Sequence, residues 1–535
     1  MMACMVNQPA ARTLAALLSL LPATAIAQAI DPSGVTGTRI LGGGGKLPAS
    51  IHERFVSLAG GNDAHIVLVP TASKRADNPS DRQRLLARWR ESHPDAHFEV
   101  LHTRDRTVAD SERFTAPLRR ATGIWFGGGS QSRIAKAYVS TRFEDEMHSL
   151  LKRGGVVGGS SAGAAIQTRV MIAGGKERPD LKRGFDLLPR AIVDQHFLAR
   201  GRLPRLLQAV DQNPGWFGLG IDEGTAVIVQ GRKIEVLGDS KALFVLPKTA
   251  TKPQKITELS AGDRSDLTTW QRAARQRATR EWPPSKASPP IVASGAVLLG
   301  GGGALPDSVF EQFIRLAGGT GARVLLVPTA SPSTGRRSDY VGRKLRQLGV
   351  AKLETLDPEH PDQVTQEHID QIDRATGVWF GGGRQWRIVD AFEGTKVPAA
   401  FRRVLKRGGV IGGSSAGATI QGEFLVRGDP LGNRTMWCEG YDRGFGFLPG
   451  CAVDQHFVAR NRVQDLQQLI QTVPQVIGIG IDEGTAAIIQ KGVLRVVGRS
   501  KVAVFDSRIE PIQIKPIWLD PGDRWDLVRR DRPPR

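Results

Sequence analysis

The stretch KRGGVVGGSSAGAAIQ, residues 152–167, decides the fold, and it returns as KRGGVIGGSSAGATIQ at residues 406–421. In each copy an apolar β-branched run ends in paired glycines, and small residues follow it. This pattern predicts a buried strand, a tight turn and the start of a helix. Ser161 and Ser415 fit the G-x-S-x-G pattern, in which such a turn exposes a nucleophilic hydroxyl at the end of a strand.

Further stretches recur in the same order on both sides of this one. ATGIWFGGGSQSRI (121–134) returns at 375–388, VDQHFLARGR (193–202) returns as VDQHFVARNR (453–462), and GIDEGTA (220–226) returns at 480–486. A chain of 535 residues is too long for one ordinary domain, and an internal repeat explains its length. We expect one domain at 36–268, a second at 294–535, and between them an exposed basic connector at 269–293 that is rich in Arg, Pro, Ser and Lys.

Each repeat alternates strand-like and helix-like segments. HIVLVP (65–70), GIWFGG (123–128) and FGLGI (217–221) are unbroken apolar runs, whereas SIHERFVSLAGG (50–61) has apolar residues at helical spacing. The alternation predicts an α/β fold with a mostly parallel, doubly wound sheet in each repeat, and active groups at the carboxyl ends of its strands. TAVIVQGRKIEVLG (225–238) predicts a hairpin that extends this sheet with antiparallel strands.

The N-terminal residues have the pattern of a secretory signal. Arg12 precedes an apolar stretch at 14–26, and Ala25 and Ala27 occupy the positions that a signal peptidase prefers. We expect residues 1–27 to be a cleavable signal and the protein to be periplasmic or extracellular, with a frayed helix as the alternative. Two cysteines follow this segment, Cys438 and Cys451, and the sequence leaves open whether they pair.

The charge balance widens the range of partners to be considered. The net charge of +20 allows nucleic acid or an acidic polymer as a partner. The basic connector lacks the interleaved aromatic residues that stack on bases, which argues against nucleic acid. The chain also has no apolar run long enough to span a membrane. The glycine-rich LGGGGK and LGGGGA stretches lack the phosphate-loop pattern, and we interpret them as closely packed backbone after the first strand.

A nucleophilic serine needs a base and an oxyanion site. His196 and His456 follow apolar runs within DQHF and are the candidate bases, although a hydrogen-bonded structural histidine would give the same pattern. The amides of Ala162 and Ala416, at the expected helix starts, would hold the oxyanion. The GGG loops would supply a second amide, from Gly128 and Gly382.

Together these motifs resemble the cyanophycinase family. GG-x-Q, GGSSAGA, DQHF-x-x-R-x-R and GIDE-x-TA occur in this order, and the resemblance covers both repeats. The family consists of serine exopeptidases related to peptidase E, with a flavodoxin-like, class I glutamine-amidotransferase-like fold. The resemblance implies hydrolysis of cyanophycin, a poly-aspartate backbone bearing arginine side groups, to β-aspartyl-arginine dipeptides, without a cofactor or a metal.

The resemblance also implies roles for individual residues. Ser161 and Ser415 would be nucleophiles, with His196 and His456 as bases. The implied substrate-binding residues are Gln131, Asp194, Gln195, Arg200, Arg202 and Arg205 in the first repeat, and Gln385, Asp454, Gln455, Arg460 and Arg462 in the second. Arginine suits this role because its guanidinium holds a carboxylate through two parallel hydrogen bonds.

The third catalytic residue is less clearly marked. The family has a carboxylate between the serine and the histidine, and we expect Glu177 and Asp429 from their similar distance after the serine. Glu223 and Glu483 of GIDEGTA are alternatives, although a structural role at a strand end is the stronger expectation for them.

One further difference between the repeats affects the expected substrate block. Asp465 stands in the second repeat where the first has Arg205, so one repeat is expected to be weaker or to differ at one subsite.

Two other functions stay open. One is a peptidase E-like aspartyl dipeptidase, and the other is a polymer-binding module in which one repeat is catalytically weak. The expected partner is cyanophycin or a related aspartate-rich polymer, rather than nucleic acid or a membrane. The sequence leaves the oligomeric state open, and an intramolecular pseudo-dimer is one arrangement.

Overall fold

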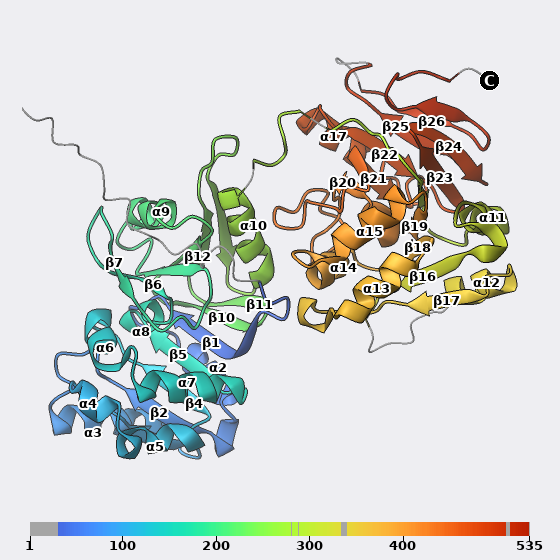
Figure 1. Ribbon diagram of the computed structural model, residues 1–535. Coiled ribbons are helices and arrows are strands. Elements are labelled where there is room, and N and C mark those ends of the chain that lie inside the picture. The colour runs from blue at the N-terminus through green and yellow to red at the C-terminus, as the bar shows by residue number, and fades with distance from the viewer. Residues whose placement is uncertain (1–29, 280, 287, 333–339, 510–513, 534–535) are drawn as a thin grey trace, which may run out of the picture.

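The computed structural model describes residues 30–279, 281–286, 288–332, 340–509 and 514–533, and it consists of two lobes built alike (Figure 1). The expected signal, residues 1–27, lies outside the described residues. No helix in the described ranges is both long and apolar enough to cross a membrane.

The main sheet of the first lobe has the order β14-β11-β10-β1-β5-β4-β2-β3. Its parallel part comprises β1 (Val35–Gly42), β5 (Val156–Ser160), β4 (Gly123–Phe126), β2 (His65–Val69) and β3 (His97–Val100). The antiparallel part comprises β10 (Thr225–Gly231), β11 (Lys233–Gly238) and β14 (Arg264–Asp266). The expected doubly wound sheet and its hairpin extension are therefore confirmed.

Helices cover both faces of this sheet because alternate strand residues point to opposite sides. On one face α2 (Ala49–Leu58) and α3 (Pro79–Ser92) pack against Ile66, Leu68 and Trp125. On the other, α5 (Glu112–Arg120), α6 (Gln131–Tyr138) and α7 (Arg142–Lys152) pack against Val67 and Phe126. The short helix α4 (Arg106–Ala109) precedes α5.

A second, smaller sheet adjoins the first and was not expected. Its order is β13 (Lys255–Ser260), β12 (Lys241–Leu246), β9 (Phe217–Ile221) and β8 (Ala191–Gln195), with α9 (Leu203–Asp211) between β8 and β9 in sequence. The FGLGI run, expected in the main sheet, forms β9 here. The short helix α8 (Ala162–Ala165) and the hairpin β6 (Val170–Gly174) and β7 (Asp180–Arg183) connect the two sheets along the chain.

The second lobe repeats both sheets. Its main sheet is β17 (Lys352–Thr355), β16 (Arg323–Val327), β18 (Gly377–Phe380), β19 (Val410–Ser414), β15 (Ala296–Gly300), β23 (Thr485–Gln490), β24 (Val493–Gly498) and β27 (Arg524–Asp526). The smaller one is β20 (Gly422–Phe424), β21 (Leu448–Gln455), β22 (Ile477–Ile481), β25 (Val502–Phe505) and β26 (Ile517–Leu519). Even the strand register is shared, because Gly42 pairs with Ser160 and Gly300 pairs with Ser414.

The helices of the second lobe also follow those of the first. They are α11 (Asp307–Leu316), α12 (Tyr340–Gln347), α13 (Gln366–Arg374), α14 (Gln385–Phe392), α15 (Val397–Lys406), α16 (Ala416–Thr419) and α17 (Val463–Thr472). The tandem duplication expected from the sequence is thus a duplication of the fold.

The prediction of an exposed connector at 269–293 is wrong for the first part of that segment. Helix α10 (Leu267–Thr279) buries Trp270 and Ala273 against the first lobe. Its arginines face acids of the second repeat: Arg272 Nη2 lies 2.8 Å from Asp390 Oδ1, and Arg277 Nε lies 2.7 Å from Glu439 Oε1. The basic character of the connector therefore serves ion pairs between the repeats rather than a solvated linker.

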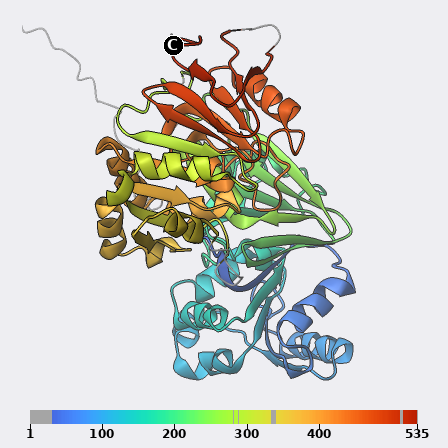
Figure 2. The same cartoon turned by 90° about the vertical axis from the view of Figure 1, so that its right-hand side faces the viewer.

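Arg232, at the turn between β10 and β11, extends this contact. It donates to Asp266 within its own repeat and to Asp390 and the Tyr441 hydroxyl of the second repeat, at 2.5, 2.7 and 2.9 Å. In Figure 1 and Figure 2 the green part of the chain, which includes α10, lies between the blue and the red parts. Buried ion pairs across this contact fix the two repeats against each other.

Candidate active site

The predicted strand, turn and helix around each serine are confirmed. Strand β5 ends at Ser160, α8 begins at Ala162, and Ser161 between them has φ 53°, a left-handed value that non-glycine residues rarely adopt. Ser415 has φ 57° in the same setting. A Cβ atom on Gly159 would lie 2.5 Å from the Gly163 carbonyl, so the turn requires glycine at that position.

The two histidines lie against the serines, as the sequence predicted. Ser161 Oγ is 2.9 Å from His196 Nε2, and Ser415 Oγ is 3.0 Å from His456 Nε2. The glycine-rich loop after β1 makes room for the ring, because a Cβ on Gly44 would lie 2.4 Å from the Cε1 atom of His196. The interpretation of LGGGGK as closely packed backbone is confirmed, and what packs on it is the imidazole.

The carboxylates that meet the imidazoles are Glu223 and Glu483, so the expectation of Glu177 and Asp429 is wrong. The Nδ1 atom of each histidine lies 2.5 Å from Oε1 of the glutamate. Glu177 is exposed in the turn between β6 and β7. Asp429 instead accepts hydrogen bonds from its own loop, from the Leu431 N–H and the Thr435 hydroxyl.

Strand pairing explains why Glu223 takes this position. Strands β8 and β9 are parallel neighbours in which Gln195 pairs with Ile221. The residues that follow, His196 and Glu223, therefore emerge side by side at the carboxyl ends of the two strands. The same pairing of Gln455 with Ile481 brings Glu483 to the second histidine.

The surroundings of each imidazole favour its neutral form. Burial lowers the pKa of His196, the hydrogen bond to Glu223 opposes this, and the positive charge of Arg200 lowers the pKa further. Burial likewise lowers the pKa of His456. A neutral ring that donates Nδ1–H to the glutamate leaves Nε2 free to accept the serine proton, which is the arrangement of a Ser–His–acid triad.

The loop after β4 brings a glycine beside the serine. Gly127 N–H donates to Val69 O at 3.1 Å and Ser130 N–H donates to Ala72 O at 2.9 Å, which fixes Gly128 between them. A Cβ on Gly128 would lie 3.7 Å from the Cβ of Ser161, and one on Gly382 would lie 3.5 Å from that of Ser415. Gly128 and Gly382 thus lie beside the serines, and Ala162 and Ala416 begin the helices that follow. Binding of an oxyanion by these four residues stays a prediction.

The expected substrate block divides into a buried and an exposed part. Asp194 has no exposed side-chain surface, and Arg205 holds it through Nε–Oδ2 and Nη2–Oδ1 contacts of 2.6 and 2.5 Å. Arg202 donates to the backbone oxygen of Gln195 at 2.6 Å and to its side-chain oxygen. Arg200 is exposed beside the histidine. The buried residues therefore hold this segment in place, whereas Arg200 faces solvent.

The glutamines of the GGGSQ and GGGRQ segments are buried. Gln131 Nε2 donates to Ile172 O at 2.7 Å, and Gln385 Nε2 donates to Val426 O at 3.5 Å. Both side chains thus tie the loop that carries the candidate oxyanion glycine to the segment after the nucleophile helix. In the second repeat Arg462 donates to Gln455 O at 2.7 Å, while Arg460 is exposed.

An arginine from another element compensates the charge reversal at Asp465. Arg427 donates to Asp454 from Nε at 3.0 Å and from Nη2 at 2.9 Å, and its Nη2 also lies 2.7 Å from Asp465 Oδ2. Position 427 corresponds to Ala173, since each follows the residue whose carbonyl accepts from the buried glutamine. The second repeat therefore keeps a buried aspartate–arginine pair, but its arginine lies on the loop after β20 and not on a helix as Arg205 does.

Comparison with known proteins identifies the chain at the level of family. The model of peptidase family S51 matches residues 40–237 and 296–497. The chain belongs to peptidase family S51. It is a serine-type peptidase with two copies of the family domain, and each copy contains one Ser–His–Glu set.

Among curated relatives the chain is similar to cyanophycinases. One from Geminocystis herdmanii is 35% identical over 204 residues, which span 36% of this chain and 74% of the relative. One from Synechococcus elongatus is 33% identical over 210 residues, which span 37% of this chain and 63% of the relative.

Two solved structures are also similar. A peptidase from an acI-B1 Actinobacterium has 22% identity and a TM-score of 0.36, and the match covers 44% of this chain and 98% of that one. A putative peptidase E protein from Listeria monocytogenes has 18% identity and a TM-score of 0.32, with 39% and 100% covered.

Proposed function

We propose that the protein hydrolyses cyanophycin, with each repeat acting as a separate Ser–His–Glu peptidase. The observation that carries the proposal is the unbroken chain of hydrogen bonds from serine through histidine to glutamate in both repeats. The similarity of the chain to cyanophycinases supports cyanophycin as the substrate.

The proposed mechanism follows from the distances in the site. Ser161 Oγ attacks the scissile carbonyl while His196 Nε2, 2.9 Å away, accepts its proton. Glu223 stabilises the imidazolium that forms, and the amides of Gly128 and Ala162 receive the negative oxygen. The imidazolium then gives its proton to the departing amine, and water hydrolyses the acyl-enzyme by the same route. Ser415, His456, Glu483 and the amides of Gly382 and Ala416 act likewise in the second repeat.

The exposed arginines beside the histidines would receive the substrate. Arg200 in the first repeat and Arg460 in the second are exposed and close enough to lower the pKa of the neighbouring imidazole. In an aspartate-rich polymer the complementary groups are carboxylates. The buried pairs around Asp194 and Asp454 hold this block in place, and they are positioning residues in the proposal.

Secretion is part of the proposal and rests on residues 1–27. Their basic start, apolar run and small residues before Gln28 have the order of a cleavable signal. The intact mass of the protein recovered from a periplasmic or culture fraction tests whether residues 1–27 have been removed. A chain that retains residues 1–27 in those fractions would contradict it.

Substrate comparison tests the proposed function against its nearest rival. The purified protein is incubated with cyanophycin and with aspartyl dipeptides, and the release of β-aspartyl-arginine or of free amino acids is measured by mass spectrometry. We expect dipeptide release from the polymer. Cleavage of aspartyl dipeptides alone would indicate a peptidase E-like dipeptidase, and binding of the polymer without release would indicate a binding module.

A further inference from the structure

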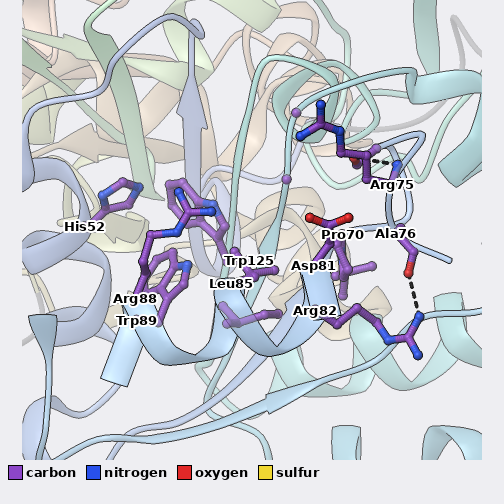
Figure 3. Close-up of a pocket in the computed structure, with 15 residues that line it drawn as sticks. His52, Pro70, Arg75, Ala76, Asp81, Arg82, Leu85, Arg88, Trp89 and Trp125 are labelled. Atoms are coloured by element: carbon purple, nitrogen blue, oxygen red, sulfur yellow. Dashed lines mark hydrogen bonds between the residues drawn. The ribbon is translucent and has the colours of Figure 1, made fainter. Parts of the chain in front are cut away.

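The first repeat contains a pocket that the proposed triad does not use. It has a volume of about 330 Å³ and lies between the carboxyl ends of β2 and β4 and the helix α3 (Figure 3). Pro70, Gly127 and Gly128 are among its lining residues. Since Gly128 also lies against Ser161, this side of the pocket lies next to the nucleophile.

The order of strands places this pocket across the serine from the imidazole. Strand β5, which leads to Ser161, has β1 on one side and β4 followed by β2 on the other. His196 packs on the loop after β1, whereas the pocket lies at the ends of β4 and β2. The departing nitrogen takes its proton from His196 and must stay near it. A group in the pocket therefore belongs to the acyl half of the substrate.

The charge of the pocket points to an anion. Arg75, Arg82 and Arg88 line it together with a single acid, Asp81, and that acid lies 2.5 Å from Arg84 Nη2. Arg82 is held by a 2.7 Å hydrogen bond to the Ala76 carbonyl. In the described part of the chain, the guanidinium groups of Arg75 and Arg88 have no hydrogen bond or ion pair with another side chain.

The walls of the pocket are rigid. Trp89 and Trp125 enclose the end near Arg88, with His52 edge-on to both rings at centroid distances of 4.9 and 5.0 Å (Figure 3). At the other end, beside Arg75, Arg104 donates to the carbonyls of Thr71 and Ser73 at 2.7 Å each. These contacts hold in place the walls on which Arg75 and Arg88 lie.

We propose that this pocket is a subsite for a carboxylate on the acyl half of the substrate, attracted by the positive charges of Arg75 and Arg88 at its two ends. This inference rests on the proposed function. In a β-aspartyl-arginine unit the arginine is joined through its α-amino group, so its own carboxylate stays free on every unit of the polymer. The subsite takes that carboxylate from the unit next to the scissile bond.

A cavity also lies at the corresponding place in the second repeat. It has a volume of about 430 Å³ and is lined by Pro328, Gly381, Gly382 and Trp379, the counterparts of residues around the first pocket. Among the described residues its lining contains no arginine or lysine and includes Asp357, so the carboxylate subsite is proposed for the first repeat alone.

The test uses the full-length chain with Ser415→Ala, so that only the first repeat turns over substrate. Synthetic three-unit β-aspartyl-arginine oligomers are compared with the arginine carboxylates free or converted to primary amides. We expect the parent to prefer the free carboxylate about tenfold in kcat/KM, mainly through KM. Arg75→Gln/Arg88→Gln should bring the preference close to one, whereas Arg113→Gln, an exposed charge on α5, should leave it unchanged.

Binding separates failure of the subsite from failure of the proposed function. In the chain with Ser161→Ala and Ser415→Ala, binding of the carboxylate oligomer is measured by calorimetry. Adding Arg75→Gln/Arg88→Gln should lower the affinity of the site in the first repeat about tenfold. An unchanged affinity, or an unchanged preference in turnover, overturns the subsite. Loss of all turnover in the Ser415→Ala parent contradicts the proposed function instead, and the binding result then still decides on the pocket.

Discussion

The buried charge pair of the second repeat predicts a rescue by exchange. Arg427→Ala removes a guanidinium that is 3% exposed and leaves Asp454, which is fully buried, with Arg462 Nη1 at 3.0 Å as its remaining ion-pair partner. Breaking a buried pair by removing one member costs roughly 3–5 kcal/mol. Because Arg462 remains, we expect the lower end, about 3 kcal/mol.

The second substitution rebuilds the arrangement of the first repeat. Adding Asp465→Arg to Arg427→Ala places an arginine on α17, as Arg205 is placed on α9, and an alanine at position 427, the counterpart of Ala173 in β6. The double variant should recover at least about 2 kcal/mol of the loss. Asp465→Arg alone sets two arginines against each other and should destabilise the second repeat.

Calorimetric unfolding measures these changes repeat by repeat. Arg205→Ala serves as the matched variant and identifies the transition of the first lobe. For a domain of this size about 3 kcal/mol corresponds to a fall in Tm of roughly 6–12 °C. A Tm of Arg427→Ala within about 1 °C of the wild type, or a double variant no more stable than Arg427→Ala, would contradict the stabilising role of this buried pair.

Three further predictions concern the triad of the first repeat, measured in the Ser415→Ala chain. Glu223→Gln keeps a hydrogen-bonding side chain but removes the charge that stabilises the imidazolium, so kcat should fall about 10²–10⁴-fold with little change in KM; an unaltered kcat would exclude Glu223 from the triad. Because burial lowers the pKa of His196, the acid limb of kcat/KM should have its midpoint below the ordinary value of about 6.5, with activity rising as pH increases through it, and a midpoint above 7 would contradict this. Gly44→Ala would place a methyl group 2.4 Å from the His196 ring, so it should abolish turnover while the circular dichroism spectrum stays that of the parent. Full activity of this variant would show that close packing of the ring on Gly44 is not required.

The fold could be predicted from the sequence because its signals are local and occur twice. Runs such as GIWFGG are apolar throughout, as strands covered on both faces must be, and all four residues of β4 are buried. The serine turn was predictable for the same reason, since the glycines that it requires lie within a few residues of Ser161.

The acid could not be predicted from sequence distance because strand pairing brings it to the histidine. Glu223 lies 27 residues after His196, yet β8 and β9 are parallel neighbours and end together. Glu177 is closer to Ser161 in sequence, but the β6–β7 hairpin carries it to an exposed turn. The usable signal was the recurrence of the acid in GIDEGTA immediately after a predicted buried strand.

Two other features depend on contacts between distant segments. The connector has the composition of a solvated linker, but its arginines are neutralised by Asp390 and Glu439 more than a hundred residues away. The exchange of Arg205 for Arg427 involves two positions in different elements. Comparing the repeats position by position would have revealed it, because Ala173 becomes arginine where Arg205 becomes aspartate.

In the proposed function, Ser161 and Ser415 are two separate nucleophiles that act on the same polymer. The most direct measurement is the rate of β-aspartyl-arginine release from cyanophycin by the wild type, Ser161→Ala, Ser415→Ala and the double variant. We predict that each single variant retains the activity of the other repeat and that the double variant releases no dipeptide above the uncatalysed rate. Dipeptide release by the double variant would contradict the claim.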